Sequence, residues 1–176
     1  MTHLYKALLG PDWETLSPVT RHLHSPDPIV LLEGRVDVVR GANPLARLIA
    51  RILGLPRAGQ RQSALVKVST AGSGELLERW YDGRHFATVQ DRSGVCLTER
   101  FGPFKLRFTL RVDAGVLHFD QAGVALWGVE LPGPVSPKIS ATERAEAETH
   151  LFDVALSLPL VGLIVHYRGR LGLAAD

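Results

Sequence analysis

Three polar residues that alternate with apolar ones, Glu99, His85 and Tyr167, could carry acid–base chemistry. In a strand, residues two apart face the same way, so a polar residue in an apolar phase is expected to point into the protein interior. The apolar residues in phase are Val95, Leu97 and Phe101 for Glu99, Ala87 and Val89 for His85, and Leu163, Val165 and Leu171 for Tyr167. A carboxyl, an imidazole and a phenol around an apolar substrate could exchange protons with it. These three residues are therefore the candidate catalytic residues.

A structural interpretation of the same three residues competes with the catalytic one. Glu99 would then form an ion pair with Arg79 or Arg100 at the rim of a barrel. His85 and Tyr167 would be hydrogen-bonded residues of the core or the rim, as buried polar groups usually are. The two interpretations differ in how the side chains lie relative to one another, which the sequence alone does not determine.

Metal binding and nucleophilic catalysis have weaker support. His22 and His24 form a close pair, but they lie between prolines, and no cysteine or second histidine pair completes a four-ligand set. The single Cys96 has no base beside it in the sequence, and there is neither a Gly-x-Ser-x-Gly turn nor a phosphate-binding loop. We therefore expect no metal site and no cofactor.

The elements that must position these residues are strands. In residues 104–113, five apolar side chains alternate with polar ones over a length that is unusual for an open sheet and favours a curved one. Strands are predicted at 29–40, 64–70, 75–82, 84–91, 95–101, 104–113, 116–122, 124–131, 138–148, 151–158 and 163–171. Short turns such as Asp82-Gly83 join them, as in hairpins. The sequence thus predicts a mainly β protein, an antiparallel meander of about ten strands that forms a lipocalin-like barrel or a strongly curved sheet.

Helices are expected at two places, within residues 3–24 and at 44–53. The second begins with Asn43 as N-cap and Pro44 in the first turn. Its apolar residues, Leu45, Leu48, Ile49, Ile52 and Leu53, fall on one stripe, with Arg47 and Arg51 on the other side. The stripe is expected either to cover an open end of the barrel or to pack on the outside of the sheet.

The interior of a barrel of this size could hold one small hydrophobic or amphipathic ligand. The residues expected to line it are Trp80, Phe104, Leu106, Phe108, Leu110 and Trp127. Arg47 and Arg51 are expected to meet an anionic head group at its mouth. Which face of the 75–82 strand points inward stays open, because its two phases are almost equally apolar.

Composition limits the class of protein. The 176 residues fit a single domain, 1–176, with 45% hydrophobic and 22% charged residues. One cysteine and the lack of a signal-peptide pattern predict a cytoplasmic protein. The arginine cluster at 35–61 contains no aromatic residue, so nucleic-acid binding is not expected. A membrane surface is an unlikely partner, because the 44–53 helix is short and packing in the fold competes for its apolar face.

Several blocks of the chain also occur together in one known family. These blocks lie at residues 4–10, 43–56, 100–104, 157–163 and 167–169. With this spacing the whole chain resembles the bacterial domain-of-unknown-function family 4166. In that family the domain often follows a saccharopine-dehydrogenase-like NAD(P)-binding module. This chain has no Gly-x-Gly-x-x-Gly after a strand, so the resemblance implies one compact module, with an oxidoreductase as a possible partner and no nucleotide site.

Three functions follow as hypotheses. The leading one is binding of a small hydrophobic or amphipathic molecule inside the curved sheet. The second is an enzyme on the same scaffold, an isomerase, cyclase or hydrolase that uses Glu99, His85 and Tyr167. The third is a non-catalytic accessory module that partners an oxidoreductase, as the resemblance implies.

Overall fold

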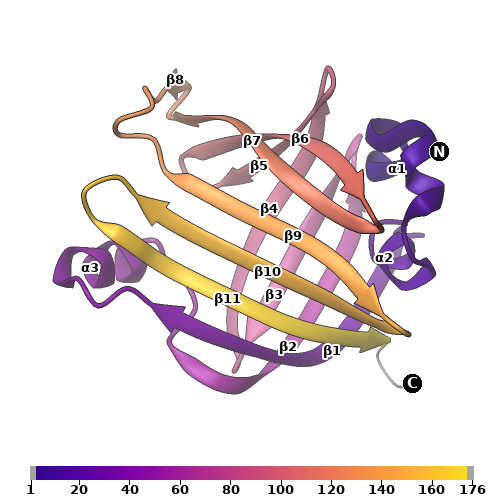
Figure 1. Cartoon of the computed structure of the whole chain (residues 1–176), viewed down its shortest axis with the longest axis horizontal. Helices are drawn as coiled ribbons and strands as arrows, with labels where there is room; N and C mark the ends of the chain where they lie inside the picture. Colours follow the sequence, from indigo (N-terminus) through magenta and orange to yellow (C-terminus); the bar gives the residue numbers. More distant parts are fainter. Residues whose placement is uncertain (1–2, 174–176) are drawn as a thin grey trace.

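Ten antiparallel strands close into a barrel in the computed structural model, which describes residues 3–173. The strands are β1 (Ile29–Arg40), β2 (Gly59–Ala71), β3 (Gly74–Tyr81), β4 (Arg84–Ser93), β5 (Cys96–Phe101), β6 (Phe104–Asp113), β7 (Val116–Leu126), β9 (Lys138–Glu146), β10 (Thr149–Leu158) and β11 (Gly162–Leu173), and a short β8 (Val129–Glu130) pairs with the end of β7. Neighbours in the chain are neighbours in the barrel. β11 pairs with β1 and β7 with β9, which closes the circle. The predicted mainly β meander and barrel are confirmed (Figure 1).

Two details of the strand prediction differ from the structure. The segments 116–122 and 124–131 were expected as separate strands, but β7 runs unbroken through Gly123 and only Val129–Glu130 form a further strand. Residues 141–148 contain alanines and glutamates that suit a helix better, yet they form the second half of β9 up to Glu146. β9 is paired along its length with β10 and at Ala141–Glu143 with β7, and these pairings outweigh the helix propensity.

The two ends of the barrel differ. α1 (Leu4–Leu9), η1 (Gly10–Thr15) and α2 (Pro18–Leu23) pack over one end, the closed end, while α3 (Pro44–Ile52) lies at the opposite end with β8 and the β10–β11 turn (Figure 1). We call that opposite end the open end and define it by its connecting segments, 40–59, 81–84, 101–104, 126–138 and 158–162. Among the described residues, no helix has both the length and the apolar character needed to cross a bilayer.

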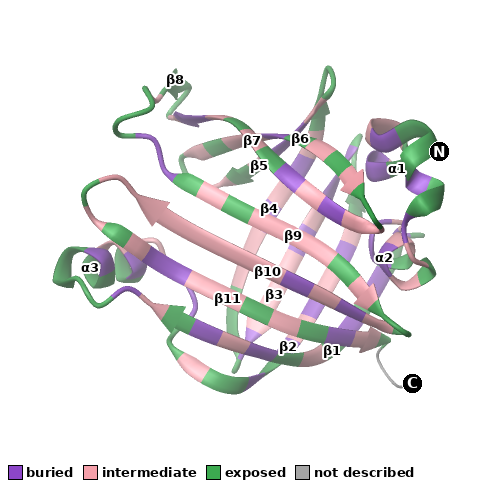
Figure 2. Cartoon of the chain, in the orientation of Figure 1, coloured by how far each residue is buried: buried purple, intermediate pink, exposed green. Residues whose placement is uncertain are grey.

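α3 packs on the rim of the open end through its smallest side chains. Ala46 and Ala50 are fully buried, and the close approach is possible because Gly41 has no side chain where it meets Ala46. Ile49 and Leu53 are partly buried against the same cluster. The other half of the predicted stripe faces solvent (Figure 2): Leu45, Leu48 and Ile52 are 49%, 53% and 73% exposed. The helix therefore lies at the open end, as one of the two predictions had it, but only the half of the stripe with Ile49 and Leu53 packs there.

The core consists of two clusters of buried side chains. One cluster lies between β1, β2, β10, β11 and α3, where Leu32, Val36 and Ile164 are fully buried. The other lies under the closed end, where Tyr5, Trp13 and Leu97 bring α1, η1 and β5 together. Buried and exposed residues alternate along most strands, as a two-residue period requires (Figure 2). The helices at the closed end are thus part of the core.

Gly34 provides a test of the barrel closure between β1 and β11. A Cβ on Gly34 would lie 1.8 Å from the carbonyl oxygen of Arg170, so the strands would have to separate. Gly34→Ala is expected to lower the free energy of unfolding by about 2 kcal/mol in urea denaturation. Gly172→Ala is the matched control, because Gly172 lies in the same strand pair and a Cβ there meets nothing within 4 Å. Equal effects of the two changes would contradict the argument.

Candidate functional site

A cavity of about 150 Å³ lies inside the barrel. Its lining near the open end is apolar and includes Leu53, Leu55, Phe101, Phe104, Ile139 and Leu156. Leu53, Phe101 and Phe104 are partly exposed, so the cavity reaches the surface there. Cavities of about this volume with Leu, Ile and Phe walls hold a molecule the size of benzene. The cavity therefore suits a small ring or a short chain.

Polar side chains gather in the middle of the cavity wall. Arg79 on β3 donates to Glu99 Oε1 on β5 at 3.4 Å and to Thr88 Oγ1 on β4 at 3.2 Å. The Arg79 and Glu99 side chains are each only 14% exposed. The Arg79 guanidinium also lies 5.3 Å from the centre of the Phe86 ring. The inward-facing residues of three neighbouring strands, β3, β4 and β5, thus form one buried ion pair, Arg79 with Glu99.

The electrostatics of this pair also involve Tyr167 on β11. Burial would lower the pKa of Arg79, but Glu99 and the nearby Tyr167 and Tyr81 outweigh it and raise that pKa above its ordinary value. Burial raises the pKa of Tyr167, so its hydroxyl stays protonated at neutral pH and can donate a hydrogen bond. The cavity wall therefore offers a cationic donor, a neutral hydroxyl donor and a carboxylate acceptor.

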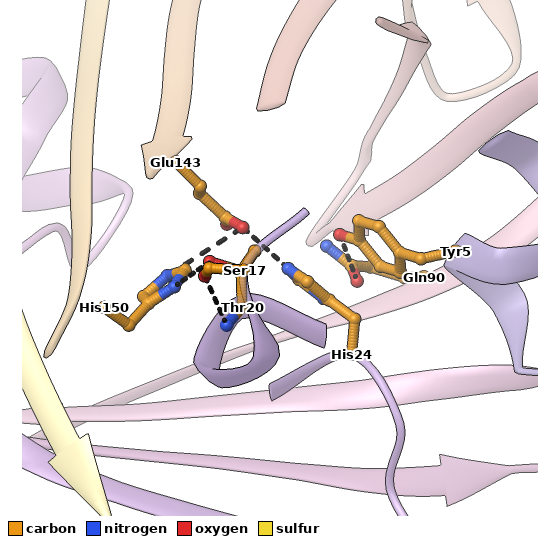
Figure 3. A network of polar contacts seen from close by, with 7 residues as sticks. All are labelled: Tyr5, Ser17, Thr20, His24, Gln90, Glu143 and His150. Carbon is orange, nitrogen blue, oxygen red and sulfur yellow. Dashed lines mark hydrogen bonds and ion pairs between the residues drawn. The ribbon is translucent and has the colours of Figure 1, made fainter. Parts of the chain in front are cut away.

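A second polar group lies deeper, against the closed end (Figure 3). His24 Nε2 lies 2.6 Å from Glu143 Oε2, and His150 Nε2 lies 3.8 Å from the same oxygen. Thr20 Oγ1 lies 3.3 Å from His150 Nδ1. Burial would raise the pKa of Glu143, but the charge and hydrogen bond of His24 outweigh it and lower that pKa. Burial lowers the pKa of His150. Glu143 is therefore held as a carboxylate where it lines the cavity.

Tyr5 connects this network to β3 and β4. Its ring stacks on His24 with 3.6 Å between the ring centres, and its hydroxyl donates to Gln90 Oε1 at 3.1 Å. Glu75, paired with Gln90 across the strands, is only 3% exposed, and its Oε2 has no hydrogen-bond partner among the described residues. Burial raises the pKa of Glu75 to about 7. Glu75 therefore takes up a proton much more readily near neutral pH than an exposed glutamate does.

The structure places several of the expected site residues around the cavity. Glu99 and Tyr167 both line it, as do Phe104, Leu106 and Phe108. Glu99 pairs with Arg79, the partner that the structural interpretation named, but in the interior and not at the rim. The catalytic role expected for Glu99 and Tyr167 stays a prediction.

Other expected site residues do not line the cavity. His85 was expected inward, but it lies on the outer face, 46% exposed, beside Glu78 and Trp80. Trp80 is also on the outer face, and Trp127 is 80% exposed in the turn between β7 and β8. Leu110 packs in the closed-end cluster, away from the cavity lining. Arg47 and Arg51 are exposed on α3 at the open end.

The sequence predicted the wrong face of the sheet for His85 and Trp80, and there is a physical reason for it. The inward phase of β4 contains Thr88 and Gln90, and that of β3 contains Glu75 and Arg79. The wall here is polar inside, so apolar residues such as Val89 mark the outer face. Hydrophobic alternation then indicates the wrong face. On β3 both phases carry charged residues, Glu75 and Arg79 on one side and Glu78 on the other, so charge did not distinguish the two faces.

Three residues of the deep network, His24, Glu143 and His150, were missed as a group. His24 and Glu143 are 119 positions apart, and only the closure of the barrel brings α2 against β9 and β10. Within the described part of the chain, no group of three or more His, Cys, Asp or Glu side chains is arranged to hold a metal ion. The His-x-His motif therefore contributes His24 to an ion pair.

Comparisons with known proteins give a family and a fold. Residues 16–171 match the family described as a domain of unknown function, DUF4166. No curated protein matches the sequence significantly. Among solved structures, a protein of unknown function from the DUF3598 family of Nostoc punctiforme is 6% identical with a TM-score of 0.50, the match covering 82% of this chain and 47% of that one. This likeness shows the fold alone.

Two further solved structures are similar at lower TM-scores. Rv2717c from M. tuberculosis is 14% identical with a TM-score of 0.49, and the match covers 91% of this chain and 99% of that one. An abundant heat soluble (SAHS) protein from Ramazzottius varieornatus is 10% identical with a TM-score of 0.44, covering 82% and 93% respectively.

Proposed function

Because this chain belongs to DUF4166, a family whose description names no activity, we propose its function from the barrel interior: it binds a small amphipathic molecule in the cavity. The observation that carries the proposal is the combination of apolar walls near the open end with three convergent polar groups, Arg79, Glu99 and Tyr167, further in. Concave apolar sites with a few polar groups are typical of small-molecule binding. The apolar part of the ligand would lie toward the open end.

The charges around the cavity favour a neutral polar group on the ligand. Arg79 is compensated by Glu99, and Glu143 is a further carboxylate in the lining. Because Arg79 is already paired with Glu99 and His24 with Glu143, a ligand carboxylate would add a negative charge without a cation of its own, and its burial would be costly. A hydroxyl or carbonyl could instead accept from Tyr167 or Arg79, and a hydroxyl could also donate to Glu99.

Three matched compounds test this preference, namely toluene, 4-methylphenol and 4-methylbenzoate. They share a ring of the size that the cavity holds and differ only in the polar group. By isothermal titration calorimetry, 4-methylphenol is expected to bind with a Kd on the order of 1 mM or tighter, toluene more weakly, and 4-methylbenzoate weakest.

A filled cavity should abolish this binding. Ala141→Phe places a ring in the lining and is expected to weaken 4-methylphenol binding at least tenfold. Ala87→Phe is the matched control, because Ala87 lies on the outer phase of β4, in register with Glu78. Equal binding by wild type and Ala141→Phe, or no binding of any of the three compounds, would contradict the proposal.

Catalysis on the bound molecule is the second candidate function. It is favoured by Glu99 and Tyr167, which both line the cavity and influence each other electrostatically, and by Glu143, a third ionisable group in the lining. His85 is outside the barrel, so the acid–base set of this candidate is Glu99, Tyr167 and Glu143. Once a substrate is known, Glu99→Gln should retain binding and lose turnover; retained turnover would leave binding as the function.

A further inference from the structure

We propose that the open end of the barrel is a docking surface for an anionic lipid bilayer. This goes beyond ligand binding, because the surface would hold the protein on a membrane whether or not the cavity is occupied. Three independent observations at this end support it: exposed apolar side chains, the sign of the charge, and the orientation of α3.

Exposed apolar side chains are concentrated at the open end. Of the twelve large hydrophobic side chains that are exposed among the described residues, seven lie in the segments that define this end. They are Leu45, Leu48, Ile52, Trp127, Val129, Val135 and Leu160. Leu160, Trp127 and Ile52, at the tips of three separate segments, are 104%, 80% and 73% exposed. A surface of this kind marks an interaction site, because soluble monomeric proteins rarely expose so many apolar side chains in one region.

The segments that carry these side chains lie at one end of the barrel, and several of them are direct neighbours. The pairing of β9 with β10 places Lys138 next to Ser157, and the β10–β11 turn follows directly at Leu158. Asn43, the cap of α3, donates to the carbonyl of Val161 in that turn. The amide of Trp127 donates to the carbonyl of Pro103, so the β7–β8 turn lies beside the β5–β6 turn. The segments that carry the exposed apolar side chains therefore lie together at the end of the barrel where Figure 1 shows α3 and β8.

The barrel is electrically polarised along its axis. The open-end segments carry six basic residues, Arg40, Arg47, Arg51, Arg57, Arg84 and Lys138, and two acidic ones, Asp82 and Glu130. The segments at the closed end, 3–30, 69–75, 91–96, 113–116 and 146–149, carry three basic and eight acidic residues. The formal charges are thus 6 − 2 = +4 and 3 − 8 = −5, although the whole chain carries only +2. An anionic surface would attract the open end and repel the closed end.

Neighbouring arginines reinforce the positive potential. The pKa of Arg40 is lowered by partial burial and then by repulsion from Arg84 and Arg57. The side chain of Arg40 donates to the carbonyls of Leu55 and Pro56, which holds its charge at the rim. Two copies of this end facing each other would bring like charges together, which argues against a second copy as the partner.

α3 presents both kinds of side chain that an interfacial helix needs. The helix packs on the barrel through Ala46 and Ala50, so packing does not use Leu45, Leu48 and Ile52. Arg47 and Arg51 are exposed beside that apolar ridge. Competition for the apolar face was one of two reasons to expect no membrane contact, and the structure leaves Leu45, Leu48 and Ile52 free of that competition, while Ile49 and Leu53 pack on the barrel. A helix with an apolar ridge flanked by arginines suits the boundary between head groups and acyl chains.

Vesicle flotation tests the proposal. Wild-type protein is mixed with vesicles of phosphatidylcholine alone or of phosphatidylcholine with about 30% phosphatidylglycerol, at low and at high salt. We expect binding to the anionic vesicles, at least tenfold weaker binding to the neutral ones, and weakening by salt. Arg47→Glu/Arg51→Glu is expected to weaken binding to the anionic vesicles more than tenfold, and Leu48→Ser/Ile52→Ser to weaken it on both compositions.

The control variant is Arg92→Glu/Arg144→Glu, which makes the same change of charge at exposed positions toward the closed end. It is expected to bind within about twofold of wild type, since its charges face away from the membrane. All variants change exposed residues, so their thermal unfolding should match wild type. Absence of binding to anionic vesicles, equal loss in the control, or a concentration-dependent dimer that Arg47→Glu/Arg51→Glu disrupts without any vesicle binding would each overturn the proposal. Failure of 4-methylphenol to bind would not overturn it, because that assay tests the cavity and vesicle flotation tests the outer surface of the open end.

Discussion

Replacing Arg79 with methionine is expected to lower the free energy of unfolding by about 3–5 kcal/mol. The change removes the cation that compensates Glu99 and leaves a carboxylate in a position that is only 14% exposed. It also removes the hydrogen bond to Thr88 and the contact with the Phe86 ring. Removing one partner of a buried pair is more damaging than removing both, because the remaining charge has lost its solvation without compensation.

The double variant Arg79→Met/Glu99→Gln distinguishes the contribution of the ion pair from that of side-chain packing. It is expected to recover most of the lost stability in urea denaturation, with a coupling free energy of about 2–3 kcal/mol. Arg92→Met is the control for loss of an exposed arginine and should change stability by less than about 0.5 kcal/mol. A small effect of Arg79→Met, comparable with the control, would mean that Glu99 is already solvated and that the middle of the cavity is wet. A charged ligand group would then be solvated in the cavity, and the preference for a neutral ligand would not hold.

Replacing Glu75 with glutamine is expected to stabilise the protein by about 3 kcal/mol at pH 8 and by less than about 1 kcal/mol at pH 5. Burial raises the pKa of Glu75 from 4.5 to about 7. Between these two values the native state holds a proton that the unfolded state has released, so this contribution to stability falls as pH rises from 4.5 to 7. Glutamine has no charge to bury, and the loss does not occur.

Other groups shift the wild-type curve, so the informative quantity is the difference between wild type and variant at each pH. The lowered pKa of His150 means that its contribution is lost as pH falls below 6.5, which opposes the effect of Glu75 in part of the same range. The lowered pKa of Glu143 acts at more acidic pH, below the unfolded value. Glu33→Gln, at an exposed position, serves as the control. A stability difference for Glu75→Gln that is the same at pH 5 and pH 8 would contradict the raised pKa.

The sequence alone determined the barrel. Strands β5, β6 and β11 alternate apolar and polar residues, and this local period predicted both the strands and the inward side of Glu99, Tyr167 and Phe108. Hairpin turns such as the one at Gly83, which has a positive φ of 75°, set the antiparallel order because they connect only neighbouring strands. The family resemblance was likewise available from the spacing of local blocks, and it is confirmed over residues 16–171.

Tertiary structure decided the site. On β4 the polar residues Thr88 and Gln90 point inward, which places His85 outside although its phase is apolar, and on β3, whose two phases are almost equally apolar, Trp80 also points outward. α3 packs through Ala46 and Ala50, because Gly41 has no side chain to keep the helix away from the barrel. This packing leaves half of the apolar stripe of α3 exposed. His24 and Glu143 met only when β7 paired with β9 and α2 covered the closed end. Local periodicity reports what each segment can bury, whereas which side it buries depends on partners that are distant in the chain.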